Sequence, residues 1–423
     1  MTCTIRSLAV WMFALALPGL AWAGGTDRFG FPDVSERIGV FADQLPNGMS
    51  DGQARFSATH YVGAQKLVLP ITRRLRRYKP GFVVIHYHLG IWQQQPRHTF
   101  IVDGRRWGND WPEVTRHEDW FWHNARGERV RSSSDGKYLM NIAHPGFREY
   151  WKRSIARQCR AGRYQGVFLD SSSVDMLHAE ARQMDPRLKG RVAVRTRFKE
   201  LGGATWREAY ESFMAGLTRY LEEQGFATIP NINAQFTTWD TTDYFSTASG
   251  AFVERAWMTR NADDWVMANR RVLRLVRNDN IVIFQPYLRK GDQDVGMRTY
   301  LLACYLLLKG RYTYINYFAR KVLSWYPEYE VNLGKPLKPV PDMDDLARGR
   351  NLFQRQYARG EVWVNAGNKA RSVEPGGLAW RVVPEGGGPV PGDGKPAGNL
   401  RFEPVRKIEL GPWSGAVLLY EAP

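Results

Sequence analysis

Short apolar runs alternate with longer amphipathic stretches along most of this 423-residue chain. Such alternation is typical of repeated βα units, in which parallel strands form a sheet and helices cover it. The runs that fit strands span residues 56–62, 82–88, 138–141, 166–170, 227–233, 250–254, 281–285 and 312–316. Eight repeats predict an α/β fold, a (β/α)₈ TIM barrel.

Seven of these eight runs, all but the first, end in a polar residue. In a (β/α)₈ barrel the C-terminal ends of the strands and the loops after them form the active-site face. The helices between the runs carry apolar stripes at a spacing of three and four residues, for example Phe147, Trp151 and Ile155. We therefore expect the helices to form core and the strand ends to carry chemistry.

The pattern changes after the barrel, which we expect to span residues 24–345. One more helix is predicted around Leu352 and Phe353, followed by a small all-β domain, a β-sandwich, so that the C-terminal domain spans residues 346–423. Its predicted strands span residues 362–365, 378–383, 401–402, 407–410 and 416–420. The Gly- and Pro-rich segment 385–399 is predicted to be a mobile loop.

The first 23 residues have the pattern of a signal peptide, with an apolar run after Arg6 and small residues before a cleavage site near Ala23 and Gly24. An uncleaved N-terminal anchor is the alternative. We expect a secreted or periplasmic protein with no integral membrane segment once the signal is removed. The mature chain keeps Cys159 and Cys304, which both lie in apolar helical patterns and are predicted to be free, buried thiols.

The formal net charge of +17 indicates a surface that favours polyanions. No nucleic-acid motif accompanies it, so we expect no nucleic-acid partner. An acidic polysaccharide or an anionic cell surface fits an exported protein better, and a solvated basic surface without a partner is the alternative. We expect a monomer.

Two carboxylates end predicted strands and are the candidate catalytic residues. Asp170 closes the run GVFLD and Glu254 closes the run GAFVE. Glycosidic cleavage needs one carboxyl group to protonate the leaving oxygen and a second to act as nucleophile or to activate water. Alternatively, Asp170 caps a helix or pairs with an Arg, and Glu254 pairs with Arg255 or Arg260.

Polar and aromatic groups around this pair suit sugar hydroxyls and sugar faces. The candidate substrate-binding residues are His86, His88, Trp92, Asn141, Asn231, Asn233, Asp240, Gln285, Tyr287 and Asn316. Trp92 belongs to a run of five tryptophans in 31 residues, of which we expect one or two to face the ligand and the rest to form local core.

His86 and His88 face the same side of a strand, as two metal ligands would. Because no third ligand and no HxxxH or HExxH helix accompanies them, we predict no metal and no cofactor. A metal-dependent carbohydrate deacetylase using these histidines stays open as an alternative. A non-catalytic polysaccharide-binding or assembly protein on the same scaffold is a further alternative.

The segments GVFLDSSSVDM, EDWFWHNARGERV, MNIAHPGFREYWK, NINAQ and GAFVER resemble the glycoside hydrolases of the GHL type, most closely hypothetical glycosyl hydrolase family 15. The resemblance runs from about Gly39 to the end and implies a distant relative of the α-amylase superfamily. It implies that Asp170 is the nucleophile or stabiliser and Glu254 the acid/base. In α-amylases the acid follows the fifth strand, where this chain has no carboxylate until Asp240, so Asp240 stays open as the partner of Asp170.

Overall fold

The protein was analysed as a computed structural model that describes residues 27–95, 101–102, 105–106, 110–132, 136–172, 182–183, 187–188, 196–232, 247–319 and 322–423. The predicted signal peptide lies outside these residues. Among the described residues, no helix is long and apolar enough to cross a membrane.

Parallel strands form the centre of the fold in two sheets. The first sheet has the order β1-β2-β3-β8-β9 and the second the order β10-β11-β12. Their bounds are β1 Phe41–Ala42, β2 Gly63–Gln65, β3 Val83–Leu89, β8 Gly166–Asp170, β9 Ala227–Pro230, β10 Gly250–Glu254, β11 Ile281–Gln285 and β12 Thr313–Ile315.

The two sheets meet at both of their edges. Asn231, just after β9, forms a single parallel bridge with Phe252 of β10, and Val40, just before β1, forms one with Ile315 of β12. The described residues do not form one continuously hydrogen-bonded closed sheet. The eight strands nevertheless follow one another in a parallel order in which each edge strand has a neighbour across the gap.

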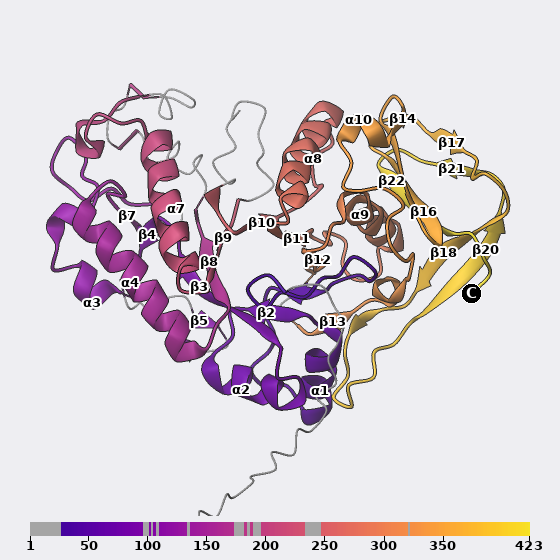
Figure 1. The fold of residues 1–423 in the computed structure, drawn as a ribbon, viewed down its shortest axis with the longest axis horizontal. Helices are drawn as coiled ribbons and strands as arrows, with labels where there is room; N and C mark the ends of the chain where they lie inside the picture. The colour runs from indigo at the N-terminus through magenta and orange to yellow at the C-terminus, as the bar shows by residue number, and fades with distance from the viewer. Residues whose placement is uncertain are drawn as a thin grey trace, which may run out of the picture.

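Helices alternate with these strands, as the sequence pattern predicts. They are α1 Asp51–His60, α2 Leu69–Tyr78, α4 Pro145–Gly162, α7 Trp206–Glu222, α8 Ala262–Arg277 and α9 Val295–Leu308. In Figure 1, α1 and α2 lie below the strands, α4 and α7 on the left, and α8 and α9 on the right. The stripe Phe147, Trp151 and Ile155 on α4 is buried, which confirms its predicted role as core.

Two of the eight predicted strands do not belong to the parallel sheets. Residues 56–62 lie largely in α1, because Ser50 and Gln53 form a capping box that starts a helix at Asp51. Residues 138–141 contain β7 (Tyr138–Leu139), which pairs antiparallel with β4 (Trp92–Gln93) in the long β3–α4 connection. The true first strands, β1 and β2, have only two and three residues, and the short apolar run at residues 39–42 that contains β1 was not among the predicted strands.

The C-terminal part is an antiparallel sheet of six strands with the order β14-β15-β16-β22-β18-β20. The bounds are β14 Ala347–Gly349, β15 Leu352–Tyr357, β16 Gly360–Asn365, β18 Ala379–Glu385, β20 Asn399–Val405 and β22 Ser414–Leu419. The helix predicted at Leu352 and Phe353 is wrong: these residues begin β15, which pairs with β14 on one side and β16 on the other. The two-stranded sheet of β17 (Arg371–Val373) and β21 (Ile408–Leu410) covers one face through Val373, Ile408 and Leu410.

The other face of this C-terminal sheet packs on α9. Of the 14 residues of α9, 11 are buried, including Cys304. A helix that is apolar all round has partners on all sides, and α9 lies between the parallel strands and the C-terminal sheet (Figure 1). Cys159 in α4 is also buried and free, so the prediction of two free thiols is confirmed.

The segment 385–399, predicted to be a mobile loop and here called the strap, contains a short strand and contacts α1. Within it β19 (Gly388–Pro389) pairs with β13 (Ser324–Trp325), and Val390 is buried. The carbonyl oxygen of Val390 accepts a hydrogen bond of 2.8 Å from Gln53 Nε2 in α1. Residues 388–390 of the strap are therefore held against α1 and β13.

A buried ion pair fixes this strap to α9. Arg298 in α9 and Glu328 in η6 (Pro327–Glu330) are both fully buried, and Arg298 Nε lies 2.8 Å from Glu328 Oε1. Arg298 Nη1 also donates to the carbonyl oxygens of Asp292 and Gly386 at 2.6 Å and 2.7 Å. One guanidinium thus joins α9, η6 and the strap.

The long β3–α4 connection is held by a second buried network, centred on Asp110. Asp110 Oδ2 lies 2.9 Å from His88 Nε2 of β3, and Asp110 Oδ1 accepts hydrogen bonds from Tyr150 and Ser154 of α4. Burial on its own would raise the pKa of Asp110, but the hydrogen bonds from His88, Ser154 and Tyr150 outweigh it and hold this pKa well below its ordinary value.

We expect Arg298→Met to destabilise the protein by about 3–5 kcal/mol, because Glu328 would stay buried without its partner. Urea unfolding at pH 7 measures this change. Lys335→Gln is the control, because Lys335 and Glu36 form an exposed pair whose loss should have little effect. Equal effects of the two substitutions would contradict a structural role of the buried pair.

The Asp110 network predicts a stability that depends on pH. Since the pKa of Asp110 in the folded state lies below the unfolded value of about 3.9, its ionised form stabilises the fold above that pH. The wild type should exceed Asp110→Asn by about 2 kcal/mol at pH 7, and the difference should shrink as the pH falls below about 4. Urea unfolding at several pH values tests this, with the exposed Glu36→Gln as control; a difference that stays constant down to pH 3 would refute it.

Candidate active site

Three strands carry the same local pattern, a Phe followed two residues later by a carboxylate. The pairs are Phe41 with Asp43, Phe168 with Asp170, and Phe252 with Glu254. All three Phe side chains belong to one buried cluster formed by residues of the parallel strands. Because residues two apart on a strand face the same side, the three carboxylates extend from this interior at the C-terminal ends of the strands.

Asp170 and Glu254 are held together by one shared donor. Asn231 Nδ2 donates to Asp170 Oδ1 at 3.0 Å and to Glu254 Oε2 at 2.8 Å. Since both oxygens lie near one nitrogen, they are no more than about 6 Å apart. The structure thus brings three of the predicted site residues into direct contact.

The two carboxylates differ in their other donors. Asp170 also accepts hydrogen bonds from Tyr87 Oη and from the backbone N–H of Ser171, both at 2.8 Å. Glu254 accepts one further hydrogen bond, from Tyr287 Oη. Burial and this contact with Glu254 raise the pKa of Tyr287, so that its hydroxyl remains a donor at neutral pH.

Asp43, Gln65 and Lys66 occupy the neighbouring sector of the same interior. Lys66 Nζ donates to Asp43 Oδ1 at 2.8 Å, and Gln65 Nε2 donates to the same oxygen. The ammonium lies 5.6 Å from the ring centre of Tyr87. Burial alone would lower the pKa of Lys66, but the charges of Asp43, Asp170 and Glu254 outweigh it and raise this pKa above its ordinary value.

Each of three inward-facing polar residues is followed by a residue in the left-handed backbone region. Lys66 follows Gln65 with φ of 58°, Ser171 follows Asp170 with φ of 52°, and Arg255 follows Glu254 with φ of 57°. Such conformations cost a non-glycine residue about 1–3 kcal/mol and gather at functional sites. Each strand therefore ends in a sharp turn directly after its inward-facing side chain.

Among the other predicted substrate-binding residues, Gln285 and Asn316 lie at the ends of β11 and β12. Gln285 pairs in register with Glu254, and its Oε1 is buried without a hydrogen-bond partner among the described residues. Asn316 follows Tyr314, which belongs to the interior cluster. Asn233 and Asp240 lie outside the described residues.

Four predicted substrate-binding residues lie elsewhere. His86 contacts Gln158 of α4 at 2.6 Å and His88 contacts Asp110, so both face the helices and not the interior of the strands. Burial lowers the pKa of His86 to about 3, which keeps the ring neutral. Trp92 is 1% exposed in core, and Asn141 Nδ2 donates to the backbone of Glu200. These placements do not support contact with substrate at the carboxylate pair.

The sequence reasoning missed Asp43, Gln65, Lys66 and Tyr87. A signal for Asp43 is present in the sequence, because GVFAD at residues 39–43 repeats the patterns GVFLD and GAFVE. Tyr87 was missed because β3 is buried on both faces. No alternation of apolar and polar residues then shows which side chains face the interior.

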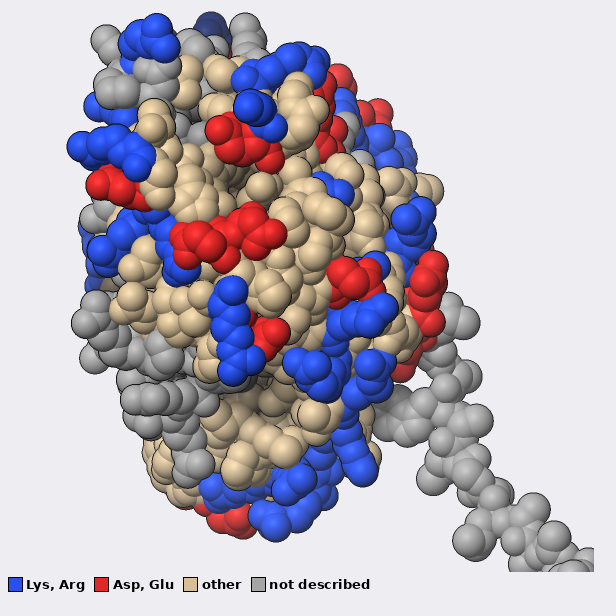
Figure 2. All heavy atoms as spheres, turned by 90° about the vertical axis from the view of Figure 1, so that its left-hand side faces the viewer, with Lys and Arg blue, Asp and Glu red and all other residues tan. Residues whose placement is uncertain are grey.

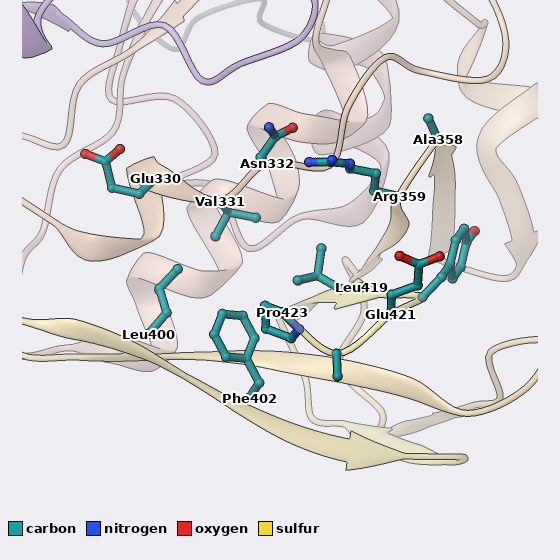
Figure 3. Close-up of a pocket in the computed structure, with 12 residues that line it drawn as sticks. Glu330, Val331, Asn332, Ala358, Arg359, Leu400, Phe402, Leu419, Glu421 and Pro423 are labelled. Carbon is teal, nitrogen blue, oxygen red and sulfur yellow. The ribbon is translucent and has the colours of Figure 1, made fainter.

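A cavity of about 570 Å³ opens between η6 and the C-terminal sheet (Figure 3). Phe402 and Leu400 line it on one side, with Glu330 and Arg359 at its edges. It contains neither Asp170 nor Glu254, so it is distinct from the site at the strand ends. Among the described residues, no three His, Cys, Asp or Glu side chains gather in a way that could hold a metal ion.

Comparison with solved structures gave distant likenesses to glycosidases. A cycloalternan-degrading enzyme from Trueperella pyogenes shares 9% identity at a TM-score of 0.47, over 95% of this chain and 61% of that one. A maltogenic α-amylase from Thermotoga neapolitana shares 10% identity at 0.42, over 91% and 99% of the two chains. A GH36 α-galactosidase from Geobacillus stearothermophilus shares 10% identity at 0.45, over 92% and 57%. At these scores the likenesses add nothing to the argument.

Comparison with curated proteins gave no match. The chain spans about three fifths of the length of the cycloalternan-degrading enzyme. Residues 76–361, which reach from α2 into β16 and include Asp170, Asn231 and Glu254, match the family model described as hypothetical glycosyl hydrolase family 15. The match covers more than half of the chain, and the chain therefore belongs to hypothetical glycosyl hydrolase family 15.

Proposed function

We propose that this protein is a glycoside hydrolase in which Asp170 is the nucleophile and Glu254 the general acid/base. The observation that carries the proposal is the bridge from Asn231 to both carboxylates at the C-terminal ends of parallel strands. In the (β/α)₈ barrel that we propose for residues 24–345, the C-terminal strand ends would share one common mouth; the single bridges of Asn231 with Phe252 and of Val40 with Ile315 support this arrangement.

The donors around each carboxylate support these separate roles. Asp170 accepts three hydrogen bonds, from Tyr87, Asn231 and Ser171, which fix its orientation. Glu254 accepts two, from Asn231 and Tyr287. We assign the nucleophile to Asp170, whose three donors fix its position, and the general acid/base to Glu254.

A separation of no more than about 6 Å between the nearest oxygens favours a double displacement with retention of configuration. In the first step Glu254 protonates the glycosidic oxygen, the bond to the anomeric carbon breaks, and an Asp170 oxygen forms an ester with that carbon. In the second step Glu254 takes a proton from water, whose oxygen attacks the anomeric carbon, and the ester bond to Asp170 breaks. Tyr287 and Asn231 hold Glu254 in place through both steps.

The expected setting of this reaction is outside the cytoplasm, on a polysaccharide or oligosaccharide, with the β-sandwich of residues 346–423 as a supporting domain. The position of His86 and His88 against α4 gives no support to the deacetylase alternative. A non-catalytic role would appear as polymer binding without release of reducing ends.

Asp170→Asn and Glu254→Gln should each keep the far-UV circular dichroism of the wild type while lowering turnover by about 10²–10⁴-fold. The assay is reducing-end release from neutral, acidic and amino-sugar polysaccharides. The exposed Asp263→Asn, in the first turn of α8, is the control and should keep full activity. Near wild-type turnover in either variant would refute the role given to that residue, and no release from any polymer by the wild type would refute the hydrolase.

The two roles and the stereochemistry can be separated with azide. In Asp170→Gly, azide should enter from the side of the lost carboxylate and give a glycosyl azide of the configuration opposite to the substrate. In Glu254→Ala, azide should attack the Asp170 ester and give the same configuration as the substrate. ¹H NMR of the products distinguishes them, and exchanged outcomes would mean that the two roles are reversed.

A further inference from the structure

A basic side chain lies at the turn after each of the two catalytic strands. Arg255 directly follows Glu254, and Lys137, from the turn before β7, reaches Ser171, which directly follows Asp170. Lys137 therefore lies on the Asp170 side of the carboxylate pair and Arg255 on the Glu254 side. Figure 1 shows β7, which follows Lys137, and β10, which precedes Arg255, on opposite sides of β8.

Arg255 is an exposed side chain in a left-handed backbone conformation. Its guanidinium lies 5.6 Å from the ring centre of Tyr287, whose hydroxyl donates to Glu254. Among the described residues it has no carboxylate partner, whereas Arg311 at the other end of the strands contacts both Asp33 and Asp279. Because Arg255 forms no ion pair with the described residues and lies in a strained conformation beside a catalytic group, we infer that it binds a ligand and does not stabilise the fold.

The opposite flank has a similar composition. Lys137 Nζ lies 3.2 Å from Ser171 Oγ and is half-buried. Beside it, the guanidinium of the exposed Arg131 lies 5.1 Å from the ring centre of Tyr138. Each flank thus combines a cation with an aromatic ring, Tyr138 on one side and Tyr287 on the other. An aromatic face suits the apolar face of a sugar, and a guanidinium or ammonium suits a carboxylate on that sugar.

The centre of the site has the opposite charge. Asp43, Asp170 and Glu254 lie there with one ammonium, that of Lys66, which already pairs with Asp43. An anionic group on the sugar being cleaved would meet two further carboxylates and be repelled. On the side of the molecule shown in Figure 2, both Lys or Arg and Asp or Glu side chains lie at the surface.

We propose that the site takes an anionic polysaccharide whose carboxylate groups lie on the sugars that flank an uncharged unit, with Lys137 and Arg255 binding those flanking carboxylates. This proposal rests on the proposed hydrolase and names the substrate class of the same site. It differs from attraction by net charge, because it predicts that Lys137 and Arg255 contribute more to binding of the polysaccharide than other basic residues do.

The test measures binding separately from cleavage. Asp170→Asn protein is run in gels containing hyaluronan, in which uronate units alternate with uncharged units, or uncharged dextran. Lys137→Gln with Arg255→Gln should weaken retention by hyaluronan about tenfold, the loss expected for two charge-assisted contacts. Arg73→Gln with Arg77→Gln, which removes the same charge from the exposed side of α2, should change retention less than twofold.

Equal losses in the two double variants, no retention by hyaluronan, or stronger retention by dextran would each overturn the flanking-carboxylate proposal. The hydrolase is judged separately, by reducing-end release from the protein with Asp170 intact. Cleavage of an uncharged polymer, with an unchanged KM in the Lys137 and Arg255 variant, would refute the substrate class and leave the hydrolase standing. Loss of hyaluronan retention in that variant alone, without cleavage of any polymer, would support the binding site and refute the hydrolase.

Discussion

The site depends on the strict alternation of side chains along a β-strand. Phe168 and Phe252 pack in the interior of the parallel strands, so the residues two positions later, Asp170 and Glu254, must face the same side. A shift of one residue would place both carboxylates against the helices, where His86 and His88 lie. Burial of the aromatic residues thus sets the direction of the catalytic groups.

Much of the architecture could be predicted from the sequence, because most strands and helices produce apolar patterns that extend over several consecutive residues. Six predicted strands coincide with β3, β8, β9, β10, β11 and β12, and the apolar stripe of α4 is core as expected. Of the first two strands, β2 has only three residues and forms no recognisable run, whereas β1 lies in the run GVFAD, whose likeness to GVFLD the prediction did not use. β2 pairs with β1 on one side and with β3 on the other, and these pairings join segments that are separated in the sequence.

For the site, the end residues of strands were predictable where the strand ends in a single polar residue, as at Asp170 and Glu254. They were not predictable in β3, which is buried on both faces, so that His86, Tyr87 and His88 look equivalent in the sequence. Lys66 is still harder to predict as a site residue, because the direction of its side chain depends on its left-handed backbone conformation and on the ion pair with Asp43, which follows another strand. An ion pair between residues of different strands, such as Lys66 and Asp43, produces no periodic pattern in the sequence.

Because α9 is buried on all sides, the C-terminal sheet cannot be exchanged freely for another domain during evolution. An exchange of the C-terminal sheet by recombination near residue 346 would leave the apolar outer face of α9 in water, and would leave Arg298 without the carbonyl oxygen of Gly386. A foreign β domain would therefore have to match both the helix surface and the strap. We expect the two parts to have diverged together as one evolutionary unit, with compensating changes across their contact.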